Sequence, residues 1–498
     1  MAPTTSTPTP DSTIPKTPSG IAGLDEILLG GLPQGRATLI SGGPGTGKTV
    51  VGLEFLYQGA LAGEAGIFIT FEESAHAIRR NAQAMGWDIQ ALEADSKLFV
   101  MQAEVPTDLV LSGEFTIDGL LAILEGQVQA IGARRIVIDA LDGLLWLFQD
   151  PRRQQNQLHA LYRWLRRQEL TAIITTKQAD TTTDLYYILD YLVDCVLRLD
   201  QRIVRQVMTR RLRVLKYRGS AFLSNEYPYI IARRGIELIP ISTVQLQQHP
   251  LGPPVSTGNH PLDQLLNGGF RRAASILIAG SSGTGKTTLA CSFAVAACAR
   301  GERVLYVSFE EAEEALVQTM LSPGVDLQPA LAAERLQILT AMPESVGVEE
   351  HLLRVLRAIE SFQPHHLVLE AISACRRMGS EQAAFDFLVR LVDCCKARGI
   401  TALYTNQIRP APAEPYPNVE EISGFGLSSF MDVLLLLQQR WWQQSYERRL
   451  LIIKARGSQH SHHFHPFTIS NAGITLLPSV VRDTTDGDSA NGWEEAAP

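Results

Sequence analysis

The sequence predicts an α/β protein of two tandem domains, each with a mainly parallel β-sheet flanked by helices. Three observations lead to this fold class. The chain of 498 residues exceeds the usual size of one domain. A glycine-rich motif occurs once in each half, and apolar runs typical of buried strands alternate with helix-favouring stretches in both halves. This alternation is typical of a parallel sheet covered by helices.

The strands are expected where apolar runs are followed by glycine or by polar residues. In each half, the first run leads into the glycine-rich motif and then into helix-favouring residues, which indicates a strand, a loop and a helix. The segments expected to contain strands are 37–49, 66–73, 134–141 and 171–178 in the first half, and 275–287, 303–311, 365–372 and 401–407 in the second.

The two halves are copies of one unit. Gly-Thr-Gly-Lys-Thr at 45–49 recurs at 283–287, so the lysines are 238 residues apart (286 − 48). A period this long indicates duplicated domains, because solenoid repeats are about 20 to 50 residues long. The same offset relates Leu24-Asp25 to Leu262-Asp263, Gly30-Gly31 to Gly268-Gly269, Glu72-Glu73 to Glu310-Glu311, and Lys216-x-Arg218-Gly219-Ser220 to Lys454-x-Arg456-Gly457-Ser458.

Composition gives the expected domain boundaries. We expect a first domain over 18–245, a linker rich in proline and glycine over 246–257, and a second domain over 258–478. The Thr- and Pro-rich lead, 1–17, and the acidic tail, 479–498, are expected to be disordered. The lead lacks the apolar region of a signal peptide, and no apolar run reaches the length needed to span a membrane.

Charge and cysteine content narrow the function classes. The net charge is −8 and the isoelectric point is near 5.8, which argues against nucleic acid as a main partner. The arginines between 198 and 218 are expected to form a solvated hairpin rather than a nucleic-acid site. The six cysteines have neither CxxC spacing nor metal-ligand spacing with histidines, so we expect a cytoplasmic protein.

Both glycine-rich segments match the phosphate-binding pattern GxxxxGK[ST] between a predicted strand and a predicted helix. Backbone N–H groups of such a loop surround phosphate oxygens, the lysine reaches the β- and γ-phosphates, and the threonine hydroxyl binds Mg²⁺. The alternative, a turn without a ligand, is disfavoured because both copies have this context. The expected ATP-binding residues are Gly42, Gly43, Pro44, Gly45, Thr46, Gly47, Lys48 and Thr49, and Gly280, Ser281, Ser282, Gly283, Thr284, Gly285, Lys286 and Thr287.

Acidic residues follow other predicted strands, at the sheet edge where α/β proteins bind ligands. We expect one glutamate of each pair, Glu72 with Glu73 and Glu310 with Glu311, to act as the catalytic base. Without the nearby glycine-rich motif, each pair would instead be read as part of a solvated acidic turn at the start of a helix.

Mg²⁺ is expected between the loop threonine and a strand-end carboxylate in each copy. The residues are Thr49 with Asp139 and Thr287 with Glu370. Because Glu370 is one methylene longer than Asp139, we expect the second site to differ from the first in metal geometry and turnover.

These features together resemble the KaiC family of tandem RecA-like ATPases, the central components of cyanobacterial clocks. The resemblance extends from Pro18 to about Pro478, and it includes LDxxLxGG openings at 24–31 and 262–269. It implies two RecA-like P-loop domains in a double-ring homohexamer, with ATP bound between subunits. It also implies ATP hydrolysis in the first ring and autophosphorylation in the second. The residues implied to contact the ATP of a neighbouring subunit are Lys216, Arg218, Lys454 and Arg456.

The resemblance also implies phosphoacceptors and partners. When Asp194 is aligned with Asp432, Ser428 and Ser429 lie opposite Asp190 and Tyr191, so the two serines are the expected autophosphorylation sites. From composition alone, they would cap a turn. The segment before them, from Ile408 to Gly426, has the length and composition of a flexible acceptor loop. The short acidic tail argues against a KaiA-like partner, and a KaiB-like partner of the first ring is compatible with the sequence.

Three function classes are therefore compared. The first is a KaiC-like ATPase and serine/threonine autokinase that acts as a timing or signalling switch, with ATP and Mg²⁺ as cofactors. The second is a nucleotide-gated assembly scaffold without kinase activity. The third is a RecA-type recombinase. The net negative charge disfavours it, and so does the lack of an evident basic DNA-binding arm.

Overall fold

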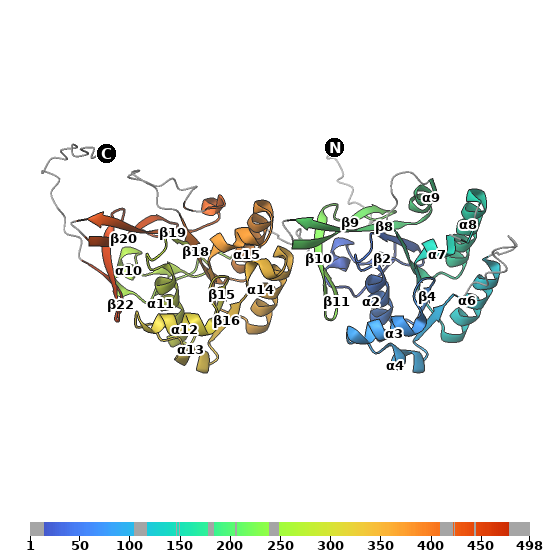
Figure 1. Ribbon diagram of the computed structural model, residues 1–498, viewed down its shortest axis with the longest axis horizontal. Coiled ribbons are helices and arrows are strands. Elements are labelled where there is room, and N and C mark those ends of the chain that lie inside the picture. Colours follow the sequence, from blue (N-terminus) through green and yellow to red (C-terminus); the bar gives the residue numbers. More distant parts are fainter. Residues whose placement is uncertain are drawn as a thin grey trace, which may run out of the picture. The chain divides into compact units, whose positions relative to one another are not determined.

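A computed structural model describes residues 14–103, 117–145, 147–148, 150–177, 184–204, 207–238, 249–408, 422, 424–442 and 445–477 (Figure 1). The chain divides into two compact units, the first consisting mainly of residues 1–245 and the second mainly of residues 246–498. The acidic tail (479–498) lies outside the described residues, as do most of the N-terminal lead and most of the segment 408–426 before Ser428.

The first unit contains a nine-stranded sheet in the order β11-β10-β9-β8-β3-β7-β6-β4-β5. The pairs from β8 to β5 are parallel, and β8 to β11 continue as antiparallel neighbours. The strands are β3 (Ala37–Gly42), β4 (Gly66–Thr70), β5 (Leu98–Gln102), β6 (Arg135–Asp139), β7 (Thr171–Lys177), β8 (Cys195–Val204), β9 (Val207–Tyr217), β10 (Glu226–Ala232) and β11 (Gly235–Leu238).

Apolar side chains cover both faces of this sheet, because alternate residues of a strand point to opposite faces. In β6, Val137 packs in the core that includes α2, whereas Ile136 and Ile138 pack in the core that includes α6 and α8. The strands are therefore continuous apolar runs, as expected for a parallel sheet between two helical layers. The helices are α1 (Leu24–Ile27), α2 (Lys48–Leu61), α3 (Ala75–Ala84), α4 (Ile89–Ala94), α6 (Asp118–Ile131), α7 (Leu141–Leu145), α8 (Pro151–Arg167) and α9 (Asp184–Leu192).

The second unit repeats this arrangement, with the sheet order β16-β15-β17-β18-β14-β19-β20-β21-β22. Its strands are β14 (Ser275–Gly280), β15 (Val304–Ser308), β16 (Leu336–Thr340), β17 (His366–Glu370), β18 (Thr401–Gln407), β19 (Val433–Trp442), β20 (Ser445–Ala455), β21 (His465–Ser470) and β22 (Gly473–Leu476). Its helices are α10 (His260–Leu265), α11 (Lys286–Ala299), α12 (Glu313–Leu321), α13 (Gln328–Ala332), α14 (Val348–Phe362) and α15 (Glu381–Ala397), with short 3₁₀ turns η1 (Pro343–Ser345), η2 (Ile372–Arg377) and η3 (Leu427–Ser429). The predicted fold class, two mainly parallel sheets flanked by helices, is confirmed.

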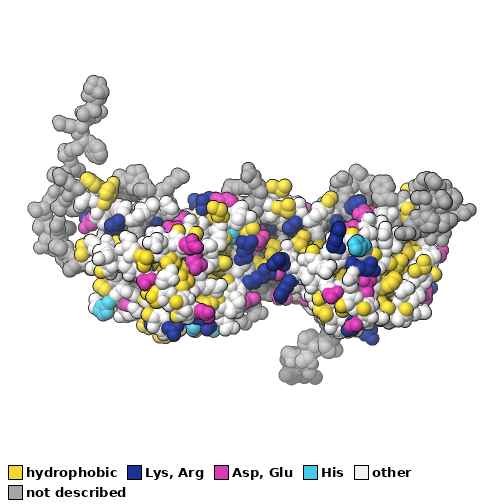
Figure 2. Space-filling model, turned by 60° about the horizontal axis from the view of Figure 1, so that its bottom comes forward, with side chains coloured by type: hydrophobic (Ala, Val, Ile, Leu, Met, Phe, Trp, Pro, Cys, Tyr) yellow, Lys and Arg dark blue, Asp and Glu magenta, His cyan; other side chains and the backbone are white. Residues whose placement is uncertain are grey.

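Short strands lie at the start of each unit, within segments that the sequence analysis assigned to the lead and the linker. Lys16–Thr17 form β1, which pairs with β2 (Leu32–Pro33). Pro254–Val255 form β12, which pairs with β13 (Phe270–Arg271). In the part of the chain that the structure describes, no helix is long and apolar enough to cross a membrane. Basic and acidic side chains both occur on the face in Figure 2.

Candidate nucleotide sites

The predicted site residues of each unit lie along one edge of its sheet, because the carboxyl ends of parallel strands meet there. In the first unit, β3 ends at the glycine-rich loop and α2 begins at Lys48. Asp139 ends β6, and Glu72 follows β4. The second unit brings the corresponding residues to the same edge of its own sheet.

The first loop has the backbone of a phosphate cradle. Gly45 and Gly47 have φ angles of 73° and 88°, a region that favours glycine. A Cβ atom on Gly47 would lie 2.8 Å from Ile231 Cδ1, so a side chain there would displace the end of Ile231 in addition to straining the backbone. Lys48 Nζ donates to the carbonyl oxygens of Gly42 and Gly43 at 2.8 and 3.0 Å. These bonds hold the ammonium against the loop that is expected to receive phosphate.

The second loop has the same form. Gly283 and Gly285 have φ angles of 76° and 96°. Lys286 Nζ and Thr284 Oγ1 each donate to the Ser281 carbonyl at 2.8 Å. Burial lowers the pKa of Lys286, and it also lowers the pKa of Lys48 in the first loop. A nearby polyanion would oppose both shifts, because it favours the charged amine.

The first strand-end carboxylate is held by two hydroxyls. Thr49 Oγ1 donates to Asp139 Oδ2 at 2.9 Å, and Thr175 Oγ1 donates to Asp139 Oδ1. Burial raises the pKa of Asp139, and these hydrogen bonds and the Lys48 charge oppose that shift. A hydroxyl beside a carboxylate fits Mg²⁺, which usually takes one or two protein oxygens together with phosphate and water.

The second carboxylate is held differently. Thr287 Oγ1 donates to Glu370 Oε1, as expected from the first site, but Glu370 Oε2 accepts from the hydroxyl of Tyr306. Burial raises the pKa of Glu370. The oxygen donors again fit Mg²⁺. Among the described residues, no group of three or more His, Cys, Asp or Glu side chains could hold a metal ion, so phosphate and water would complete either site.

The members of each glutamate pair lie in different surroundings. Glu72 forms an ion pair with Lys177 at 2.9 Å, and its charge opposes the lowering of the Lys48 pKa. Glu73 instead accepts a hydrogen bond from Asn81 Nδ2 at 3.1 Å. In the second unit, Glu310 has the corresponding effect on the pKa of Lys286. The first glutamate of each pair is therefore the one whose charge reaches the loop lysine.

The second glutamate of each pair, Glu73 in the first unit and Glu311 in the second, helps to fix the turn that follows the strand. The backbone N–H of Glu73 donates to Thr70 Oγ1 at 3.1 Å, and that of Glu311 donates to Ser308 Oγ at 3.0 Å. The matching hydroxyls, Thr70 and Ser308, end β4 and β15. These bonds fix the turn that carries the glutamate pair in each unit.

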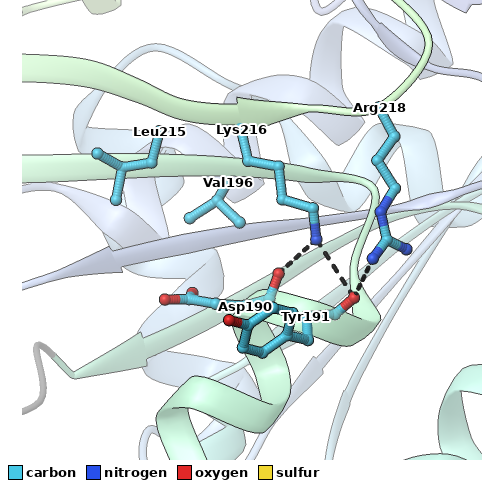
Figure 3. Close-up of a pocket in the computed structure, with 6 residues that line it drawn as sticks. All are labelled: Asp190, Tyr191, Val196, Leu215, Lys216 and Arg218. Atoms are coloured by element: carbon cyan, nitrogen blue, oxygen red, sulfur yellow. Dashed lines mark hydrogen bonds between the residues drawn. The ribbon is translucent and has the colours of Figure 1, made fainter.

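Lys216 and Arg218, which we call the first fork, face the end of α9 (Figure 3). Lys216 Nζ donates to the carbonyls of Asp190 and Val193, the latter at 2.6 Å, and Arg218 Nη2 donates to the carbonyl of Tyr191 at 2.6 Å. These side chains border a pocket of about 350 Å³. Arg218 and Tyr191 are exposed, so the fork lies at a surface of the unit.

The second fork makes the equivalent contacts. Lys454 Nζ donates to the carbonyl of Ser428 at 2.9 Å, and Arg456 Nη2 donates to the carbonyl of Ser429 at 3.3 Å. The serines are therefore the structural counterparts of Asp190 and Tyr191. They lie in the short turn η3, where Ser429 is exposed and Ser428 is half-buried. Neither serine side chain caps this turn.

Sequence reasoning missed residues that contact these loops from neighbouring strands. Arg210 was assigned to a solvated hairpin, but its Nε donates to the Gly45 carbonyl at 3.3 Å. Arg448 makes the same bond to the Gly283 carbonyl, also at 3.3 Å. The offset of 238 that relates these arginines was the available signal. Tyr306 was missed because it lies inside an apolar run that reads as an ordinary buried strand.

Comparisons with known proteins agree with this geometry. The family model described as "ATPase: KaiC" matches residues 17–243 and again residues 255–481. Circadian clock protein KaiC2 of Synechocystis sp. is 37% identical over 469 residues, which cover 94% of this chain and 82% of that protein. Circadian clock oscillator protein KaiC of Parathermosynechococcus lividus is 32% identical, with 94% of this chain and 86% of that protein covered. The chain therefore belongs to the KaiC family of ATPases.

Proposed function

We propose that this protein binds and hydrolyses Mg·ATP at two sites per chain and assembles as a homohexamer whose second domain autophosphorylates. The observation that supports ATP chemistry best is the repeated set of loop lysine, loop threonine and strand-end carboxylate. In this proposal, Lys48 and Lys286 neutralise charge on the β- and γ-phosphates. Mg²⁺, when bound beside the threonine and carboxylate, neutralises further charge on the same oxygens.

Glu72 and Glu310 are the proposed bases. Each follows a strand at the loop edge, and its charge reaches the loop lysine. Glu72 would orient the attacking water, and Glu310 would accept the proton of the attacking hydroxyl. Release of phosphate from ATP by the purified chain tests hydrolysis. Glu72→Gln should lower it in the first domain, with Glu73→Gln as the matched variant that should lower it less.

The forks favour a shared site between subunits. Lys216 and Arg218 are held at a surface by backbone carbonyls, where their charge is available to a second copy of the chain (Figure 3). Analytical ultracentrifugation with Mg·ATP should give six chains per particle. A double variant, Lys216→Ala/Arg218→Ala, should weaken both assembly and hydrolysis. A monomer that retains full hydrolysis would overturn the shared-site proposal.

Autophosphorylation is proposed for Ser428 and Ser429. Ser429 is exposed, and both carbonyls contact the second fork, so the hydroxyls lie beside the cations proposed to clamp a phosphate. Intact mass after incubation with ATP should increase by one or two phosphates, and Ser428→Ala/Ser429→Ala should abolish the increase. ATP binding without any mass increase would instead support the assembly scaffold.

A role as a timing or signalling switch follows from the clock names of the relatives. Phosphate occupancy at the two serines, followed over a day, tests it. The six free thiols are compatible with the reducing cytoplasm that we propose as its compartment. Co-purification with a KaiB-like protein tests that partner, and hydrolysis stimulated by DNA would favour the recombinase alternative.

A further inference from the structure

The two metal-site carboxylates are held from opposite sides of their strands. In the first unit, β6 lies between β7 and β4, and the second hydroxyl on Asp139 comes from Thr175 of β7. In the second unit, β17 lies between β18 and β15, and the second hydroxyl on Glu370 comes from Tyr306 of β15. The hydroxyl donor has therefore moved from the strand beside the phosphate-loop strand to the strand on the far side.

The residue that corresponds to Thr175 is present in the second unit but is not used. Thr405 is the fifth residue of β18, as Thr175 is the fifth residue of β7. Its Oγ1 is buried and makes no hydrogen bond to the residues that the structure describes. Because its side chain has an extra methylene, Glu370 places its carboxylate away from this threonine. The carboxylate accepts a hydrogen bond from the Tyr306 hydroxyl instead.

Three buried differences between the units occur together around this carboxylate. The Tyr306 side chain is fully buried, and its hydroxyl also lies 3.7 Å from the Cys291 sulfur. The smaller cysteine leaves room for the hydroxyl, because cores are packed without large voids. The paired positions are Leu53 and Cys291, Phe68 and Tyr306, and Asp139 and Glu370.

We propose that Tyr306 is the positioning residue for Glu370, and that the Tyr306–Glu370 pair replaces the Thr175–Asp139 pair as the device that fixes the metal-site carboxylate. This inference rests on the proposed function, since it assumes that the second site binds Mg·ATP. The Tyr306 hydroxyl leaves Glu370 Oε1 toward Thr287, where the metal is expected. Thr405 does not contact the carboxylate as long as residue 370 is glutamate.

The test uses the full chain with Lys48→Ala, so that the second site dominates nucleotide binding. The probe is a fluorescent N-methylanthraniloyl derivative of ATP, and the measured quantity is the Mg²⁺ concentration for half-maximal binding. Tyr306→Phe should raise this concentration about tenfold, because loss of a hydrogen bond to a metal-site ligand commonly weakens metal affinity by that factor or more. Glu370→Asp should raise it less, because Thr405 can bond the shorter side chain while the buried Tyr306 hydroxyl loses its acceptor beside the site.

The double variant separates positioning from general damage to the core. Tyr306→Phe/Glu370→Asp restores the residue types of the first site at these two positions. The Thr405 hydroxyl should then donate to the aspartate, and the Mg²⁺ requirement should return to within about threefold of the parent. Adding Thr405→Val should remove this rescue. Thr405→Val alone should leave the parent unchanged.

Tyr404→Phe is the matched control, because Tyr404 is equally buried but lies near Cys395 of α15 on the other face of the sheet. It should leave the Mg²⁺ requirement unchanged. Losses that simply add in the double variant, or a loss with Thr405→Val alone, would overturn the inference. A Lys48→Ala parent that binds no nucleotide at any Mg²⁺ concentration would instead overturn the proposed function.

Discussion

The first and second domains share strand order and loop conformation, and the lysine of each loop donates to a carbonyl of that loop, yet the domains differ in the buried groups next to the loop. Around the expected metal position, the first has an aspartate bonded to a threonine of a neighbouring strand, whereas the second has a glutamate bonded to a tyrosine. The first also buries a carboxylate, Glu54, in the helix that follows its loop, where the second has Ser292. The comparison teaches that the glycine-rich loop has the same conformation in both copies, whereas the buried residues beside it differ as sets of residues in contact with one another.

The largest expected effect comes from removing either loop lysine. Lys48→Ala and Lys286→Ala should each lower ATP affinity at their own site about 100-fold or more, because charge-assisted hydrogen bonds to phosphate are lost. Each variant is the matched control for the other. Bound nucleotide, released by acid and measured by chromatography, should fall from two to one per chain. Two nucleotides per chain in either variant would contradict the prediction.

The fold and the loops could be predicted from the sequence because their signals are local. Apolar runs, glycines and the offset of 238 residues are all visible along the chain. The second hydroxyl on each carboxylate, from Thr175 or Tyr306, could not be predicted, because it depends on which strands become neighbours and on their register. The contact of Arg210 with Gly45 could not be predicted for the same reason, since the two residues are 165 positions apart.

Glu54 shows a second limit of sequence reasoning. A glutamate in a helix is expected to be solvated, but Glu54 is only 4% exposed. It is covered by the turn between β10 and β11, where a Cβ atom on Gly235 would lie 2.4 Å from both carboxylate oxygens. Its Oε2 accepts a hydrogen bond from the backbone N–H of Ile236 at 2.7 Å. The burial depends on a hairpin about 180 residues away, as the separation of 182 between these bonded residues indicates.

This carboxylate should make the first domain sensitive to pH. Burial raises the pKa of Glu54 to about 7 from an ordinary value of 4.5. The folded state therefore binds this proton more tightly than the unfolded state does. The contribution of Glu54 to the free energy of unfolding is thus largest below about pH 4.5 and falls until about pH 7. The free energy of unfolding lost over this range is at most about 3 to 4 kcal/mol, since each pH unit between 4.5 and about 7 corresponds to about 1.4 kcal/mol.

Glu54→Gln should remove this pH dependence, because glutamine cannot ionise and can still accept the bond from Ile236. Hydrogen exchange of peptides from α2 and β10–β11, compared at pH 5.5 and 8, measures the effect after correction for intrinsic exchange rates. The parent should lose protection at the higher pH by more than the variant does. Ser292→Ala, the matched change in α11, should have the same effect at both pH values. Equal pH responses of the parent and Glu54→Gln would contradict the prediction.

The smallest expected effect comes from replacing the two strand threonines, Thr175 and Thr405. This comparison distinguishes the two domains most directly. Thr175→Val removes the hydroxyl that Asp139 accepts from, so the Mg²⁺ requirement of the first site should rise about tenfold. Thr405→Val, at the same strand position, removes a buried hydroxyl that has no hydrogen-bond partner among the described residues. Because valine and threonine have nearly the same shape, packing should survive in both variants.

Each threonine variant is measured with the opposite site silenced, Thr175→Val in Lys286→Ala and Thr405→Val in Lys48→Ala. The readout is the Mg²⁺ concentration that gives half-maximal binding of the fluorescent nucleotide. Thermal unfolding of both variants establishes that they remain folded. Equal fold increases of the Mg²⁺ requirement, each relative to its own parent, would mean that the domains hold their carboxylates alike in solution, since loss of a hydroxyl that is not bonded to the carboxylate should leave the metal position unchanged.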